Sequence, residues 1–351
     1  MAATDIPGGP GRPKASEDRL DAIRNEASTT GKVVTGAGRA NADALIPGAE
    51  DYYNLPLLKP PTWTWEVPLY FYIGGITGVS SVIAFVGHLF HTDPRMVRVA
   101  LWIAMVGTVL CPALLISDLG RPLRFLNMLR VFKWRSAMSM GSWILSGFGG
   151  AAFLALAANE LILHGIQSPL LPPLRWVGEF AGAVTGLLLA SYTGVLIGAT
   201  AIPVWHENRR LLPAHFLTSG LGGSSAILEF FGFLVPATQI LGLAAAGVET
   251  LIGMMLEFRH RRVDAPLHHG KSGWTMRIAG TLEGPVALFV RIFSKGSAHG
   301  RYAAAACFLV GALCSRYAWI WAGRASAHDP QAVFETQHVA IAAKKATQRA
   351  M

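Results

Sequence analysis

The residues that could carry chemistry gather where long apolar runs begin or end. Glu66 and Tyr70 stand at the start of the first run, Asp118 ends the second, Tyr192 lies within the fourth and His206 follows it. A quinone head needs hydrogen-bond partners, a proton source and an apolar entrance, which Tyr hydroxyls beside a carboxylate or His can supply. We interpret these residues as a candidate quinone site. Tyr192 lies about 15 Å inside its run, so the interfacial aromatic belt explains it poorly.

Four further carboxylates fall inside apolar runs, at Glu179, Glu229, Glu249 and Glu283. Ionisable side chains at membrane depth are rare and usually face the interior of a helix bundle. We expect Glu179 and Glu283 to be helix-end carboxylates that water reaches. Glu229 and Glu249 are candidates for proton transfer, although each could equally pair with a buried Arg or Tyr.

The elements that must position these residues are membrane-spanning helices. Only 15% of the 351 residues are charged, and the mean hydropathy is +0.40; soluble domains carry roughly 25% charged residues. The fold class is therefore predicted to be all-α, a polytopic membrane protein with about eight transmembrane helices in a bundle. A helix needs about 20 apolar residues to cross the hydrocarbon core, and the runs that qualify are 68–90, 97–117, 139–163, 174–202, 211–232, 234–257, 276–294 and 302–322.

The seventh run is the weakest, because Glu283, Gly284 and Pro285 interrupt it. A bundle of seven helices is the alternative.

The chain before the first run is polar and rich in Gly, Pro and charge. The predicted domains are a polar cytoplasmic N-terminal extension over 1–60, a transmembrane domain over 61–325 and a C-terminal tail over 326–351.

Basic residues concentrate in alternate loops, at 118–137, 203–210 and 258–275. Cytoplasmic loops of membrane proteins carry the excess of Lys and Arg. We therefore expect these loops and both termini to be cytoplasmic, in a multi-pass protein of the cell inner or plasma membrane.

Several function classes fit poorly. A membrane cytochrome needs histidines well inside its helices as haem ligands, and the histidines of this chain lie at run edges, in loops or in tails. We therefore expect no haem in this chain. The three cysteines form no CxxC pair, so we expect no iron–sulfur cluster either. The net charge of +9 comes without a basic stripe or base-stacking motif, which disfavours nucleic acid. A transporter is the main competing class, although the two halves show no obvious self-similarity.

The chain resembles the NrfD/PsrC family, the membrane subunits of polysulfide-reductase-type complexes. The resemblance runs over about residues 55–335, and the DLGRP segment followed by MSMGSW is its most specific part. The segments that carry it are Trp65–Gly75 (WEVPLYFYIGG), Ser117–Arg130 (SDLGRPLRFLNMLR), Ser139–Trp143 (SMGSW), Tyr192–Leu196 (YTGVL) and Ala322–Pro330 (AGRASAHDP).

The resemblance implies eight or more helices, no haem, and a quinone site near the face where an iron–sulfur subunit docks. That subunit would connect to a molybdopterin or other catalytic subunit. By the same resemblance, Glu66, Tyr70 and Tyr192 correspond to quinone-contacting positions. Asp118 and Arg121 belong to the shared motif, and both are candidates for the quinone site. An Asp–Arg pair could instead fix a loop and cap a helix end.

These observations predict a quinone- or quinol-interacting membrane anchor subunit of a respiratory oxidoreductase complex. It would exchange electrons between a partner iron–sulfur subunit and the quinone pool, with menaquinone or ubiquinone as the exchangeable cofactor, and would not hold the catalytic centre. Arg124, Arg130 and Arg135 are the candidates for partner docking. The alternatives are a proton-translocating or transporter-type subunit without its own redox chemistry, and a structural anchor with a degenerate site.

Overall fold

The computed structural model describes residues 58–118, 124–134, 136–259, 261–294 and 296–334, and within them all regular secondary structure is helical. The N-terminal extension before residue 58, the tail after residue 334, Arg121 and Arg135 lie outside the described residues. The long helices are α3 (Glu66–Leu89), α4 (Pro94–Asp118), α6 (Ala137–Leu163), α7 (Leu171–Gly198), α9 (Leu211–Phe230), α10 (Pro236–Glu257) and α14 (Ala298–Ala327).

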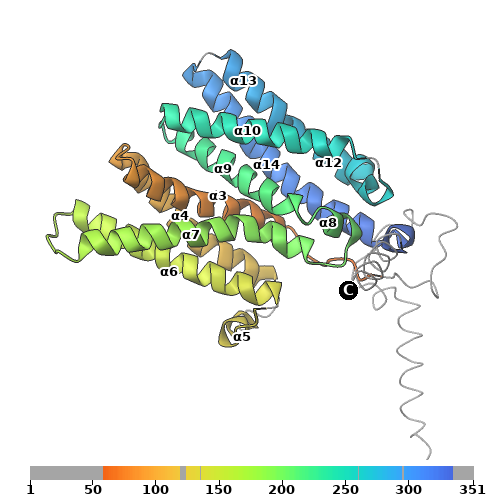
Figure 1. Ribbon diagram of the computed structural model, residues 1–351, viewed down its shortest axis with the longest axis horizontal. Helices are drawn as coiled ribbons and strands as arrows, with labels where there is room; N and C mark the ends of the chain where they lie inside the picture. The colour runs from red at the N-terminus through yellow and green to blue at the C-terminus, as the bar shows by residue number, and fades with distance from the viewer. Residues whose placement is uncertain (1–57, 119–123, 135, 260, 295, 335–351) are drawn as a thin grey trace, which may run out of the picture.

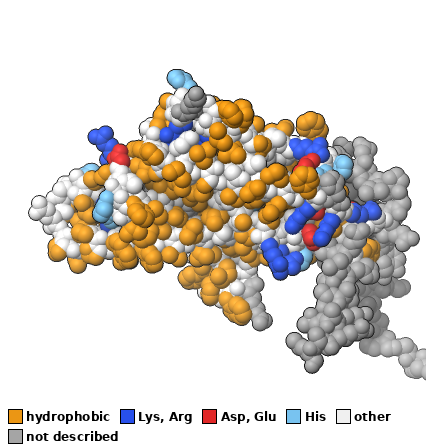
Figure 2. Space-filling view, turned by 45° about the horizontal axis from the view of Figure 1, so that its top comes forward, with side chains coloured by type: hydrophobic (Ala, Val, Ile, Leu, Met, Phe, Trp, Pro, Cys, Tyr) orange, Lys and Arg blue, Asp and Glu red, His pale blue; other side chains and the backbone are white. Residues whose placement is uncertain are grey.

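Six of these helices are long and apolar enough to cross a membrane, namely α3, α4, α6, α7, α10 and α14. Exposed hydrophobic side chains cover the middle of the molecule, whereas charged side chains lie toward its two ends (Figure 2). Surfaces of this kind face lipid, because a soluble protein rarely exposes so large an apolar belt. The predicted all-α polytopic membrane fold is confirmed.

The fifth and seventh predicted spans differ from the other six. The fifth is α9, which is rich in Gly and Ser and packs against α3, α7, α10 and α14. The seventh consists of α12 (Gly270–Thr281), the π-helical turn η3 (Leu282–Val286) and α13 (Ala287–Phe293). Gly284 leaves helical geometry there, and Pro285 has no amide hydrogen to donate. The predicted interruption is therefore a local break within a continuous path.

The helices form two bundles that lie side by side (Figure 1). We call α3, α4, α6 and α7 the N-terminal bundle, and α9, α10, α12–α13 and α14 the C-terminal bundle. They meet closely along α3 and α9, where a Cβ on Gly220 would lie 2.7 Å from the carbonyl oxygen of Gly75. Beside this contact Ser224 Oγ donates to the Ile76 carbonyl at 2.6 Å. In lipid the hydrophobic effect does not drive helices together, and small residues allow the close backbone packing that holds them.

The two bundles share a sequence pattern that only the structure makes visible. Along α3 and α9, residues separated by 145 positions match in the pairs Pro68 and Pro213, Phe71 and Phe216, Gly75 and Gly220, Gly78 and Gly223, Ser80 and Ser225, and Phe85 and Phe230. Along α7 and α14, a separation of 125 positions matches Gly186 with Gly311, Leu188 with Leu313, Tyr192 with Tyr317, and Gly198 with Gly323. These matches indicate that the two bundles are parallel repeats, a relation that is not obvious when the two halves of the sequence are compared directly.

Short helices close the end of the molecule at which α3 and α9 begin, which we call the basic end. They are α5 (Arg124–Arg130), α8 (Pro203–Glu207), η2 (Arg262–Asp264) and α11 (Ala265–His268). Asn208, after α8, donates to Asp264 at 3.2 Å and accepts from Arg259 at 3.0 Å. Burial raises the pKa of the Asp264 carboxyl, which the Asn208 hydrogen bond and Arg259 partly offset. These bonds fix α8 against the C-terminal bundle.

Buried ion pairs hold the opposite end. Glu229 of α9 accepts from Arg291 at 2.8 and 2.9 Å and from Arg301 at 2.6 and 3.0 Å. Glu179 of α7 pairs with Arg175 at 2.8 Å and with His88. Glu179 is fully buried. The expectation that water reaches Glu179 is wrong, because its carboxylate is enclosed with His88 of α3 and Arg175 of its own helix.

We predict that Glu229→Gln destabilises the protein. Removing the carboxylate leaves two buried guanidinium groups without their counter-charge, and breaking a buried pair in this way costs about 3–5 kcal/mol. Thermal unfolding in detergent would measure the loss. Glu207→Gln is the matched control, because Glu207 pairs with Arg261 at the exposed basic end and surface pairs contribute little. Equal melting temperatures for the two variants would contradict the prediction.

Candidate functional site

A cavity of about 80 Å³ lies within the N-terminal bundle near its basic end. We call it the first cavity. Apolar side chains form most of its wall, and polar groups come from four different helices. Its lining includes Trp63, Val67, Tyr70, Phe71, Leu115, Asp118, Met128, Met138, Ser142 and Tyr192. Tyr70, Asp118 and Tyr192, which the sequence predicted to form one site, therefore line one space.

Tyr192 is positioned by the start of α6. Its side chain, 8% exposed, reaches from α7 and its hydroxyl donates to the Ala137 carbonyl. A Cβ at Gly141 would overlap the Tyr192 ring, so only glycine fits at that position. Ser136 caps α6 by accepting from the amide of Ser139. The SMGSW segment thus builds the helix start that holds the tyrosine.

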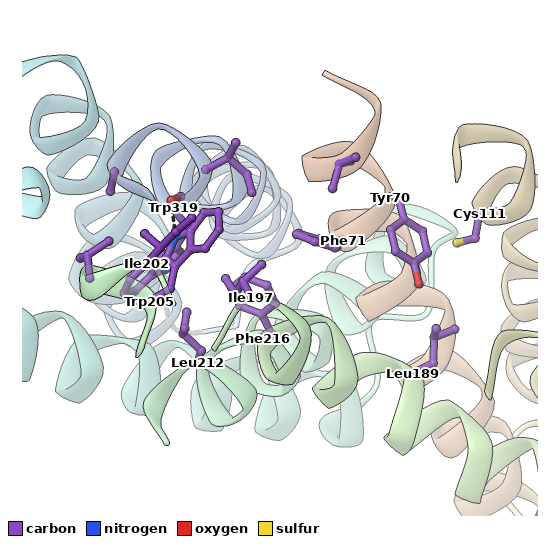
Figure 3. Close-up of a cluster of buried hydrophobic side chains, with 14 of the residues drawn as sticks. Tyr70, Phe71, Cys111, Leu189, Ile197, Ile202, Trp205, Leu212, Phe216 and Trp319 are labelled. Carbon is purple, nitrogen blue, oxygen red and sulfur yellow. Dashed lines mark hydrogen bonds between the residues drawn. The ribbon is translucent and has the colours of Figure 1, made fainter. Parts of the chain in front are cut away.

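Tyr70 projects from α3 and is buried, 2% exposed. Figure 3 shows its ring pointing toward Cys111 of α4 and Leu189 of α7. On the other side of α3, Phe71 packs against Phe216 of the C-terminal bundle with ring centroids 6.0 Å apart. Near its start, α3 therefore directs Tyr70 into the N-terminal bundle, toward the first cavity, and Phe71 against the C-terminal bundle.

Trp63 lines the first cavity, and Trp205 of α8 packs against it from outside the cavity. Trp63 stacks on Trp205 with ring centroids 5.6 Å apart. The Trp205 ring nitrogen donates to the Trp319 carbonyl at 2.8 Å, and Trp205 is fully buried (Figure 3). Tryptophans near the ends of apolar runs commonly form an aromatic belt at the membrane interface. Trp205 is instead a core residue that anchors the wall.

The two carboxylates predicted for the site meet through one hydroxyl. Thr64 Oγ1 contacts the Glu66 carboxylate and lies 3.3 Å from Asp118 Oδ1. Asp118 lines the first cavity, whereas Glu66 lies behind it at the start of α3. The structure thus brings Glu66, Tyr70, Asp118 and Tyr192 to one place, with a chain of oxygen atoms leading out from Asp118.

The other predicted site residues lie elsewhere or cannot be placed. His206 is next to Trp205 on α8 but does not line the first cavity, and its carbonyl accepts from Arg209 at 3.0 Å. Arg124 begins α5 and Arg130 ends it, close to the basic end of α6. Arg121 and Arg135 fall outside the described residues.

A second polar group, which the sequence did not reveal as a unit, lies in the C-terminal bundle. His215 of α9 is bonded through Nδ1 to Glu249 Oε2 of α10 at 2.7 Å, and Ser219 donates to Glu283 of η3 at 3.2 Å. Arg316 of α14 is close enough to interact electrostatically with both carboxylates. Glu283 is 1% exposed, so the expectation that water reaches it at a helix end is wrong.

This group lies beside a cavity of about 360 Å³, which we call the second cavity. His215, Glu249 and Glu283 line it, and it extends to Glu257 and Arg277 at the basic end. The two predicted proton carriers are thus in different surroundings. Glu249 faces a cavity, whereas both oxygens of Glu229 are held by arginines at the other end of the molecule.

Comparison with known proteins identifies the family of the chain. No curated protein matches the chain. The family model described as "Polysulphide reductase, NrfD" matches residues 56–261, which is more than half of the chain and includes all four residues that meet at the first cavity. On this match the chain belongs to the NrfD family of polysulphide reductase membrane proteins.

Proposed function

We propose that this chain binds quinone in the first cavity and passes electrons between the quinone pool and a partner iron–sulfur subunit. Membership of the NrfD family makes it a membrane subunit of a multi-subunit complex of the polysulfide-reductase type. The observation that carries the proposal is the meeting of Tyr70, Asp118 and Tyr192 around one apolar-walled space. A bound menaquinone or ubiquinone would supply the electron- and proton-carrying chemistry.

The residues of the first cavity suit a quinone head. The Tyr70 hydroxyl can donate its hydrogen to a quinone carbonyl, and the Asp118 carboxylate can accept from a quinol hydroxyl. The Tyr192 hydroxyl would donate to a quinone carbonyl by exchanging its bond to the Ala137 carbonyl. Ligand pockets usually measure about 300–1,000 Å³, so side chains must move for a ring to enter the cavity of about 80 Å³. Met128 and Met138 in its wall are suited to this, because methionine is unbranched and repacks readily.

Protons can be exchanged at the same place. The Thr64 hydroxyl lies between Asp118 and Glu66, and Glu66 is partly exposed at the start of α3. A carboxylate within hydrogen-bond reach of the ligand is a suitable general acid or base. Asp118, Thr64 and Glu66 would then carry protons between the first cavity and the basic end.

The surface beside the first cavity suits partner docking. Arg130 ends α5, and Val131 and Phe132 follow it with 49% and 55% exposure. Arginine next to exposed apolar side chains is typical of protein interfaces. We place the iron–sulfur subunit, and through it a molybdopterin-type catalytic subunit, on this surface, which includes Arg130.

We predict that Tyr192→Phe lowers quinol-coupled turnover of the purified complex by about tenfold or more, since a positioned donor contributes at least that much. Glu66→Gln should also lower it, by removing the outer proton carrier. Turnover of the catalytic partner with a soluble dye should not change. Tyr302→Phe, on the opposite end of α14, is the matched control. Unchanged quinol-coupled turnover in both Tyr192→Phe and Glu66→Gln would refute the site. If no quinone oxidises or reduces the wild-type complex, the proton-translocating alternative would be favoured.

We also predict that the basic end faces the cytoplasm. At the opposite end Arg98, Arg175 and Arg301 are all paired with glutamates, so that end offers less free positive charge to oppose translocation. A cysteine at Ile166, exposed in the loop after α6, should react with a membrane-impermeant thiol reagent on intact spheroplasts. A cysteine at Arg130 should react only after permeabilisation. The reverse pattern would overturn this orientation and the cytoplasmic placement of the termini.

A further inference from the structure

The second cavity occupies the same place in its bundle as the first cavity does in the other. By the repeat that relates α3 to α9, His215 takes the position of Tyr70. Each residue is the fifth of its helix, and both line a cavity near the basic end. Since the repeat relates the bundles, a ligand-binding role for one cavity directs attention to the other.

Two polar atoms beside the second cavity lack a hydrogen-bond partner in the part of the chain that the structure describes. These atoms are His215 Nε2 and Glu249 Oε1. The two residues are only 3% and 2% exposed, so water from outside does not supply the missing hydrogen bonds. Leaving a buried polar atom unpaired costs about 1–3 kcal/mol. Two such atoms on neighbouring residues that line a cavity indicate a ligand with its own hydrogen-bonding groups.

Charge decides what kind of ligand fits. Donor atoms of His215, Glu249 and Glu283 lie within 4.8 Å of one another, a spacing that would suit a divalent cation. Arg316, however, is 1% exposed and interacts electrostatically with both glutamates. One guanidinium and one proton shared by His215 and Glu249 already balance two carboxylates. A divalent cation would leave excess positive charge in an apolar bundle, so the cavity favours a neutral ligand.

The His215–Glu249 pair can bind both a carbonyl and a hydroxyl. When the pair holds its shared proton, Nδ1 is bonded to Glu249 and Nε2 carries a hydrogen to donate to a carbonyl. Without that proton, Nδ1–H donates to the carboxylate and Nε2 accepts from a hydroxyl. A quinone presents carbonyls and a quinol presents hydroxyls, so one pair recognises both forms.

The remaining lining fits a ring with an apolar tail. Ile252, Leu256 and Met276 supply apolar walls, and the cavity of about 360 Å³ is within the range of ligand sites. Met254 and Pro285 are on its outer side and are exposed between α10 and η3. An isoprenoid tail can therefore leave toward lipid through this opening.

We propose that the C-terminal bundle binds a second, neutral quinone ring in the second cavity, with His215 and Glu249 as its hydrogen-bond partners. The inference rests on the proposed function for its ligand class, but it concerns different residues in a different bundle. It assigns to Glu249 a contact with the ligand itself, in addition to a part in proton transfer.

Photolabelling of the full-length chain in lipid nanodiscs with an azido short-chain ubiquinone tests the proposal. Peptide mapping should recover label in two regions, one around Tyr192 and one between Glu249 and Pro285. His215→Asn and Glu249→Gln should each lower labelling of the second region by about tenfold, the effect of losing a charge-assisted hydrogen bond. Neither should alter the first region. Thr218→Ala is the matched control on α9, since its hydroxyl bonds only to the Ala214 carbonyl of its own helix.

The outcomes separate this inference from the proposed function. Label confined to the region around Tyr192 would overturn the second site and leave the first. Label between Glu249 and Pro285 that survives both substitutions would mark a lipid-filled groove, and it too would overturn the second site. Label lost around Tyr192 in Tyr192→Phe but kept in the second region would support two independent sites. If one substitution prevents folding, the wild-type map and the other variant still decide the matter.

Discussion

Each ion buried between the helices has to be paired with an opposite charge from the protein, and the rest of the structure depends on this constraint. Lipid offers no water to solvate an ion, so an unpaired buried charge would cost several kcal/mol. Glu229 meets this requirement with Arg291 and Arg301, and Glu179 with Arg175 and His88. These pairs connect helices that are far apart in the sequence. They fix the end opposite the cavities, and the polar groups at the basic end can remain available to ligands.

The contact between α3 and α9 determines where the cavities lie. Gly75 and Gly220 occupy equivalent positions in the repeat, and they touch each other. Equivalent residues meet in this way when two halves are related by a twofold axis, which for parallel repeats runs along the membrane normal. Both α3 and α9 begin at the basic end, so the repeat places Tyr70 and His215 at the same depth. Two cavities near one face follow from this symmetry.

The sequence predicted the spans well because their signal is local. Apolar runs of about 20 residues and the Gly284–Pro285 interruption can be read without knowledge of packing. The chemistry of the polar residues at the span ends further predicted that Tyr70, Asp118 and Tyr192 belong to one site. The charge partners could not be predicted, since Glu229 pairs with arginines 62 and 72 positions away. The repeat was also hidden, because its two helix pairs have different spacings and glycine is common throughout the spans. Water exposure of Glu179 and Glu283 was wrongly inferred from helix ends that other helices cover.

The arrangement of charge also bears on the direction of proton movement. Both cavities and the Asp118–Thr64–Glu66 chain are at the basic end. At the other end two arginines surround one carboxylate, which leaves a net positive charge among tightly packed helices. A fixed positive charge in a dry region repels protons, as arginine does in selective pores. Glu229 is therefore better suited to closing that end than to relaying protons through it. On this argument, proton exchange with bound quinone takes place from the basic end, the same face on which we place the iron–sulfur partner.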